Sequence, residues 1–153
     1  MTPTVTLSSL EALRAVTGGV WSGDAVVLNG VYTDSRLDGR GKLFLALKGE
    51  RFDGHDFLKN AVESGCAALC VDREKVEAAK IFGVPLLAVE NTLTAYQQLA
   101  CAFRRKFPRL KVVAVTGSVG KTSVKEMLRA VLTAASSPEK VLATEGNTNN
   151  QIG

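Results

Sequence analysis

The 153-residue sequence predicts an α/β fold in two parts: a small α/β domain over residues 1–108, and the first βαβ part of a phosphate-loop domain over residues 109–153. Strand-like and helix-like stretches alternate along the chain, which is typical of helices packed on a mostly parallel sheet. Within residues 112–127 a glycine turn joins an apolar run to a helix-like stretch, as in a strand that delivers a phosphate loop. Pro108 ends a long amphipathic stretch, so we place the boundary within residues 107–110.

The composition supports a folded chain and narrows its class. An apolar content of 46% provides enough material for a buried core. The net charge of +4 is mild and spread along the chain, so we expect no nucleic-acid partner. Cys66, Cys70 and Cys101 lie at no metal-ligand spacing and are interpreted as buried free thiols. With no signal peptide and no run of roughly 18 apolar residues, we expect a cytoplasmic protein without a membrane span.

The first predicted elements follow from capping and turn residues. Ser8 and Glu11 have the spacing of a capping box and predict a short helix over residues 8–16. The runs Val26–Tyr32 and Leu43–Leu47 are apolar or β-branched and bounded by turn residues, so they predict strands. Polar loops follow both runs.

The rest of the chain repeats helix and strand. Strands are predicted at Cys66–Val71, Pro85–Val89, Lys111–Thr116 and Val141–Thr144. Helices are predicted at Phe57–Ser64, Arg73–Lys80, Thr92–Phe107 and Lys121–Ala135. The apolar stripe of the third of these helices is expected to be Leu93, Tyr96, Ala100, Phe103 and Phe107.

The turn after the strand-like run Lys111–Thr116 carries the clearest chemistry. Gly117 and Gly120 allow backbone N–H groups to converge on phosphate oxygens, and a helix N-terminus follows. Lys121 adds a mobile positive charge for the β- and γ-phosphates, and the Thr122 hydroxyl can bind the Mg²⁺ that bridges them. We therefore expect ATP and Mg²⁺ as cofactors, with Lys121 and Thr122 as catalytic residues. The predicted ATP-binding residues are Gly117, Ser118, Val119, Gly120, Lys121, Thr122 and Ser123.

The loop departs from the usual phosphate-loop spacing, which places its first glycine at position 115, where this chain has Val115. An incidental Lys-Thr after a glycine turn is the alternative, but the strand before it and the helix after it favour nucleotide binding. Near the end of the chain, the amides of Asn147, Asn149 and Asn150 either form a turn or bind substrate or a metal-bound water.

The segments TGSVGKTSVKEML and ATEGNTNNQIG resemble the Mur ligases of peptidoglycan synthesis, whose shortened phosphate loop also lacks the first glycine. Their form is most similar to the branch that adds D-alanyl-D-alanine to a UDP-N-acetylmuramoyl-tripeptide. Residues 32–71 are similar to the uridine-nucleotide-binding domain of this family, so the resemblance covers nearly the whole chain. It implies a UDP-substrate domain over residues 1–108 and the start of the ATP-binding domain after it.

The resemblance also assigns a UDP-substrate site to two loops, and elementary chemistry is consistent with it. Hydroxyl groups can donate to a diphosphate, and an arginine can pair with it bidentately. Two alternatives stay open: Asp34 and Arg36 pair on the surface, and residues 53–56 form a turn and a helix cap. The expected UDP-site residues are Thr33, Asp34, Ser35, Arg36, Lys48, Gly49, Asp53, Gly54, His55 and Asp56.

The activity that the resemblance implies is an ATP-dependent ligation through an acyl phosphate, by a monomer that acts on UDP-N-acetylmuramoyl-tripeptide and D-alanyl-D-alanine. In this family an acidic metal ligand, a histidine, a modified lysine and a third domain complete the active site. We expect these groups to lie outside the 153 residues. The chain is thus expected to be a fragment that is inactive by itself.

Other functions remain as alternatives. The related ligase that adds the third amino acid shares the DSR and DGHDF segments, but the segment GNTNNQIG argues against it. A folate polyglutamate synthase shares the phosphate loop without needing a uridine-nucleotide domain. A non-catalytic module that binds a UDP-sugar is a different class. A nucleic-acid ATPase is disfavoured because the basic residues are scattered and lack interleaved aromatic residues.

Overall fold

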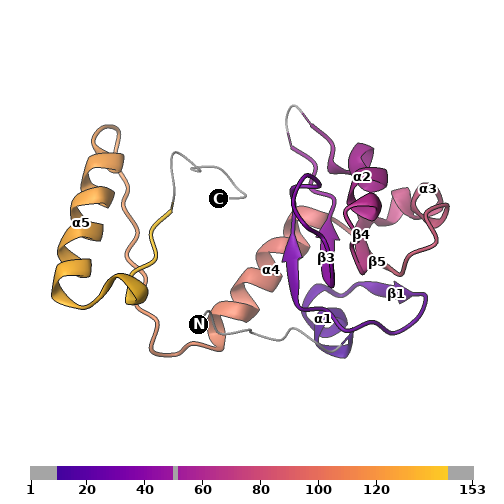
Figure 1. Cartoon of the computed structure of the whole chain (residues 1–153), viewed down its shortest axis with the longest axis horizontal. Coiled ribbons are helices and arrows are strands. Elements are labelled where there is room, and N and C mark those ends of the chain that lie inside the picture. Colours follow the sequence, from indigo (N-terminus) through magenta and orange to yellow (C-terminus); the bar gives the residue numbers. More distant parts are fainter. Residues whose placement is uncertain (1–9, 50–51, 145–153) are drawn as a thin grey trace. The chain divides into compact units, whose positions relative to one another are not determined.

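The computed structural model describes residues 10–49 and 52–144. The chain divides into two compact units, Met1–Pro108 and Arg109–Gly153 (Figure 1). The first unit contains a five-stranded sheet with helices, and the described part of the second contains one long helix. The predicted mixed α/β class is therefore confirmed.

The sheet of the first unit is parallel except at one edge. Its strands run in the order β1-β5-β4-β3-β2, with β2 to β5 parallel and β1 antiparallel to β5. Every residue of the central strand β4 is buried, as expected of a strand covered on both faces. The strands are β1 (Val20–Ser22), β2 (Gly30–Tyr32), β3 (Lys42–Leu45), β4 (Ala68–Asp72) and β5 (Leu86–Val89).

Helices connect these strands and pack on the sheet. The longest, α4, begins where the Asn91 side chain accepts a hydrogen bond from the Thr94 N–H at 2.9 Å, an N-cap. Its buried face is Thr92, Ala95 and Leu99, so the predicted stripe of larger side chains was wrong. The helices are α1 (Leu10–Thr17), η1 (Gly54–Phe57), α2 (Leu58–Glu63), η2 (Arg73–Lys75), α3 (Val76–Lys80) and α4 (Thr92–Arg105).

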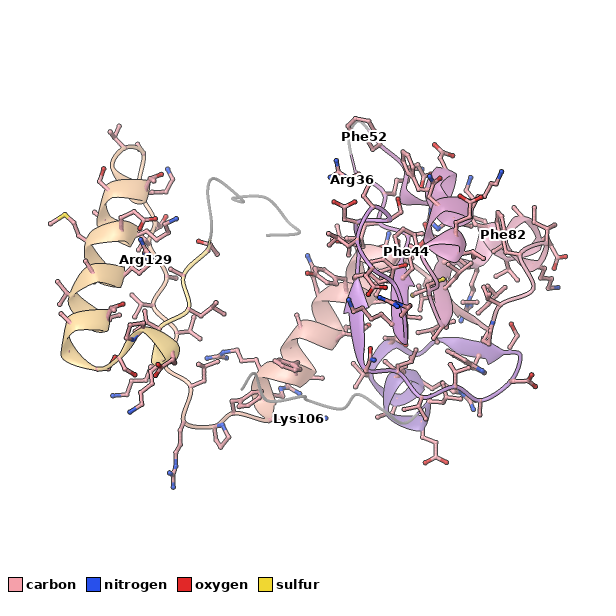
Figure 2. All side chains as sticks on the ribbon, in the orientation of Figure 1. Arg36, Phe44, Phe52, Phe82, Lys106 and Arg129 are labelled. Atoms are coloured by element: carbon pink, nitrogen blue, oxygen red, sulfur yellow. The ribbon has the colours of Figure 1, made fainter. Side chains whose placement is uncertain are left out.

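The core centres on β3 and β4, with Phe44 at 1% exposure (Figure 2). The Tyr32 ring meets the Phe44 ring edge-on, with centroids 5.2 Å apart. The Tyr32 hydroxyl lies 3.0 Å from Ser64 Oγ and donates to the Ala61 carbonyl at 3.3 Å, which joins β2 to α2. Burial raises the pKa of the Cys66 thiol to about 11, so this thiol stays protonated.

Several element predictions need correction. The predicted strand Val26–Tyr32 shortens to β2, and β1 was missed because its three residues follow a glycine pair that indicated only a helix stop. Cys66 and Cys70 are buried as expected, but Cys101 is exposed on α4. Ser8, the expected start of the capping box, lies outside the described residues. Among the described residues, no helix is both long and apolar enough to pass through a membrane.

The second unit contains α5 (Lys121–Ala135), at the predicted bounds, and a short 3₁₀ helix, η3 (Pro138–Lys140). The residues of the predicted strands Lys111–Thr116 and Val141–Thr144 have no regular secondary structure and join no sheet within the described part of the chain. Val112 and Val113 are 58% and 62% exposed. A buried strand needs neighbouring strands that pair with its backbone N–H and C=O groups, and it needs other elements packed on both of its faces. Residues 109–144 contain one long helix and no strand that could pair with these segments.

The buried position of Phe44 gives a stability prediction. We expect Phe44→Ala to lower the free energy of unfolding of the first unit by about 3–5 kcal/mol, because it leaves a cavity under the sheet. Urea unfolding followed by the fluorescence of Trp21, the single tryptophan, reports on this unit. Ile81→Ala, at a side chain 79% exposed, is the control and should change stability by no more than about 0.5 kcal/mol. Equal losses in both variants would contradict this core assignment.

Candidate functional site

The residues expected to bind the UDP-substrate come together at one edge of the sheet. Tyr32 of β2 pairs with Phe44 of β3 in a parallel register, so the loops that leave these two strands emerge at the same carboxyl edge. Residues 33–36 belong to the first loop. Residues 48–53 and the first three residues of η1, which begins at Gly54, form the second connection; we call residues 48–56 the second loop. In parallel α/β sheets this edge is where ligands bind.

The first loop carries a surface ion pair. Arg36 donates to the Asp34 carboxylate through Nε at 2.8 Å and through Nη2 at 2.6 Å. The Arg36 hydrogen bonds hold the pKa of Asp34 at about 2, well below its usual range. The surface-pair alternative thus describes this structure, and the Arg36 side chain is 87% exposed. Thr33 and Ser35 are half-buried beside the pair.

A second pair repeats the same geometry elsewhere. Arg40 donates to the Asp38 carboxylate through Nε and Nη2, both at 2.9 Å. The Arg40 hydrogen bonds likewise hold the pKa of Asp38 at about 2. The backbones of Arg40 and Cys66 form an antiparallel β-bridge just before β3 and β4 begin. The ion pair of Arg40 and Asp38 therefore lies toward the amino edge of the sheet.

The second loop folds back on itself. The Gly49 N–H donates to the Phe52 carbonyl at 2.8 Å, and the backbones of Lys48 and Asp53 form an antiparallel β-bridge. A side chain at Gly54 would lie 2.7 Å from the Leu47 nitrogen, so glycine is required there for contact between two backbone segments. At Gly49 an added Cβ would make only an ordinary contact, 3.5 Å from the Phe52 oxygen.

The far end of this loop is capped and partly buried. The Asp53 carboxylate accepts from the His55 N–H at 2.9 Å and from Nδ1 at 2.6 Å, which is the turn-and-cap alternative. Burial raises the pKa of Asp53, but the His55 hydrogen bonds outweigh it and leave the pKa below its ordinary value. The His55 side chain is 3% exposed, whereas Asp56 is on the surface. Figure 2 shows the exposed Phe52 and Arg36 at the same end of the unit.

Two buried polar residues at this edge were missed. Asp72 ends β4, and its Oδ1 accepts from the backbone N–H of Thr92, the first residue of α4, at 2.8 Å. The available signal was a carboxylate directly after an apolar strand, because a buried charge needs hydrogen bonds. Thr92 gave no signal beyond its place at a helix start.

The phosphate loop lies in the second unit. Gly117 and Gly120 have φ angles of 149° and 80°, in the region that favours glycine. Gly120 caps α5 without a side chain, and the first turn of α5 has no acidic residue. Lys121 Nζ donates to the Gly117 carbonyl, so the ammonium group lies over the loop. Ser118, Val119, Thr122 and Ser123 are exposed.

This arrangement fits the phosphates of a nucleotide. The glycines keep the loop free of Cβ atoms at two positions, the helix N-terminus favours an anion, and Lys121 supplies positive charge. Thr122 is the residue that would hold Mg²⁺; no group of three or more His, Cys, Asp or Glu that could hold a metal ion occurs in the described parts of the chain. Asn147, Asn149 and Asn150 lie outside the described residues.

Comparison with known proteins identifies several relatives. A ligase from Escherichia coli (strain K12), UDP-N-acetylmuramoyl-tripeptide–D-alanyl-D-alanine ligase, is 43% identical over 95% of this chain and 30% of its own length. The crystal structure of MurF from Acinetobacter baumannii matches with a TM-score of 0.78 and 35% identity, over 99% of this chain and 32% of that one. MurF ligase from Thermotoga maritima in complex with ADP matches with a TM-score of 0.52 and 35% identity, over 68% of this chain and 23% of that one.

The chain therefore spans about a quarter to a third of the length of these relatives. The model described as Mur ligase family, catalytic domain, matches residues 27–104, just over half of the chain. The model described as Mur ligase middle domain matches residues 115–153. On these matches, which include both the sheet edge and the phosphate loop, the chain belongs to the Mur ligase family.

Proposed function

We propose that this chain forms the UDP-substrate domain and the start of the ATP-binding domain of the ligase that adds D-alanyl-D-alanine to UDP-N-acetylmuramoyl-tripeptide. The observation that carries the proposal is the identity of 43%, over 95% of this chain, to the E. coli enzyme of that name. The bound ADP of the T. maritima relative supports nucleotide binding at the phosphate loop. Residues 1–108 are the proposed UDP-substrate domain.

The sheet edge supplies groups suited to a diphosphate. Arg36 presents a planar fork of donors, and the hydroxyl groups of Thr33 and Ser35 lie in the same loop. The loop that contains Lys48 and Gly49 leaves the neighbouring strand and forms the adjoining wall. In this proposal the uridine diphosphate lies across the carboxyl ends of β2 and β3.

The proposed reaction has two steps. A carboxylate oxygen of the tripeptide takes the γ-phosphoryl group of ATP, and ADP leaves; the amine of D-alanyl-D-alanine then attacks the carbonyl carbon, and phosphate leaves with the C–O bonding pair. Activation is needed because a carboxylate is a poor electrophile. Lys121 would stabilise the charge on the moving phosphoryl group, and Thr122 would hold Mg²⁺.

The two arginine pairs provide a matched test of the UDP site. We expect Arg36→Ala to weaken binding of UDP-N-acetylmuramoyl-tripeptide about tenfold, because a charged hydrogen-bond donor to the diphosphate is lost. Arg40→Ala removes the same kind of ion pair toward the opposite edge and should change the affinity less than about twofold. Isothermal titration of the whole chain measures both. Equal affinities for Arg36→Ala and the unchanged chain would argue against this site.

The phosphate loop gives a second test. Lys121→Ala should weaken ADP binding by roughly tenfold or more, since one charged contact to phosphate disappears. Lys140→Ala, in the exposed helix η3, removes the same charge outside the loop and should leave the affinity unchanged. Calorimetric titration with ADP and Mg²⁺ provides the dissociation constants. The assignment fails if both substitutions have the same effect.

We also propose that the 153-residue polypeptide does not turn over ATP by itself. It spans about 30% of the length of the E. coli relative, and we expect the further metal ligand and third domain that the family resemblance implies to lie outside these residues. In an assay with ATP, UDP-N-acetylmuramoyl-tripeptide and D-alanyl-D-alanine, we expect no phosphate release above background. The full-length E. coli enzyme is the positive control. Phosphate release by the chain that requires both substrates would overturn this expectation.

A further inference from the structure

A chain of buried hydrogen bonds crosses the carboxyl edge of the sheet. His55 Nε2 accepts from the Asp72 N–H at 3.1 Å. Asp72 Oδ1 accepts from the Thr92 N–H at 2.8 Å, and Thr92 Oγ1 donates to the Ala46 carbonyl at 2.9 Å. The exposed fractions of His55, Asp72 and Thr92 are 9%, 9% and 1%. These three residues, which we call the clasp, join the ends of β3 and β4 to the start of α4.

The chain of hydrogen bonds closes into a ring through the second loop. Ala46 precedes Leu47, whose carbonyl accepts from the Gly54 N–H at 2.8 Å, and Gly54 precedes His55. The close backbone contact at Gly54 leaves no space for a side chain. Both ends of the segment from Leu47 to Gly54 are therefore fixed at the sheet edge, and the Phe52 side chain between them is exposed.

The hydrogen bonds determine the tautomer of His55. A backbone N–H can only donate, so Nε2 must offer its lone pair to Asp72 and the proton lies on Nδ1. Nδ1 then donates to Asp53 Oδ1 at 2.6 Å. Both ring nitrogens of His55 are occupied within the protein. A direct bond from this imidazole to a ligand would break one of them.

We propose that His55, Asp72 and Thr92 are positioning residues of the UDP-substrate site: the clasp fixes both described ends of the second loop at the carboxyl edge, in the position where Lys48 and Gly49 meet the substrate. This inference rests on the proposed function for the identity of the ligand. It assigns to His55 a role inside the protein instead of a contact with the UDP-sugar. It adds Asp72 and Thr92, which lie outside the two loops predicted to bind the UDP-substrate.

Thr92 provides the cleanest test because its side chain is buried and cannot touch the ligand. Thr92→Val keeps the shape and removes the hydrogen bond to the Ala46 carbonyl, whereas Thr92→Ser keeps the hydroxyl. With the whole chain and UDP-N-acetylmuramoyl-tripeptide as the probe, we expect Thr92→Val to weaken binding about five- to tenfold and Thr92→Ser to bind normally. Leu99→Ala, a core change in the same helix, should destabilise the unit without changing the affinity of the folded protein.

His55→Phe is the second variant; it keeps an aromatic ring, although a larger one, and removes both ring hydrogen bonds. It should weaken binding by at least as much as Thr92→Val. Normal affinity in folded Thr92→Val, or an equal loss of affinity in Leu99→Ala, would overturn the inference.

Amide hydrogen exchange separates the clasp from the ligand. Without any ligand, the Gly54 and His55 amides should exchange about tenfold faster in Thr92→Val than in Thr92→Ser. Unchanged exchange rates would also overturn the clasp. If the exchange rates differ as expected and the unchanged chain does not bind the UDP-substrate, the proposed function fails while the clasp stands.

Discussion

Parallel pairing of β2, β3, β4 and β5 is the constraint on which the first unit depends. Because these strands point the same way, everything that follows them emerges at one edge. The Asp34–Arg36 pair, the folded loop of residues 48–56, Asp72 and the start of α4 are neighbours for this reason, although they are far apart in the sequence. Complete burial of β4 stabilises the sheet, since the backbone hydrogen bonds and apolar side chains of this strand are shielded from water on both faces.

In the second unit, the described residues form no paired strands. Helix α5 forms within the chain because its backbone bonds are local, but the flanking apolar runs need partner strands. Val124, Met127 and Val131 of α5 remain exposed at 45%, 69% and 64%. The local geometry of the phosphate loop is nonetheless complete, because two glycines, a helix start and one lysine lie within five consecutive residues.

The same distinction explains what the sequence could predict. Helix α5 and the central strands were predicted well because their signals lie in neighbouring residues. The stripe on α4 was wrong because a helix buries the face that meets its partner, here Thr92, Ala95 and Leu99, even when larger side chains lie beside it. The predicted UDP-site residues do lie in two loops at one edge, but their contacts with the UDP-substrate stay a prediction. The link from His55 to Asp72 spans 17 residues and has no periodic signature.

Both cations proposed to meet phosphates already have an oxygen partner: Arg36 is bound to Asp34, and Lys121 to the Gly117 carbonyl. Arrival of an anion is therefore an exchange of partners, and the ligand gains only the difference between two bonds. A weakly charged anion competes poorly with the Asp34 carboxylate, whereas a diphosphate that also reaches neighbouring donors can displace it. Selectivity for a diphosphate over smaller anions would then arise at both loops from competition with the protein's own oxygen atoms. Abundant small anions would bind too weakly to occupy either site.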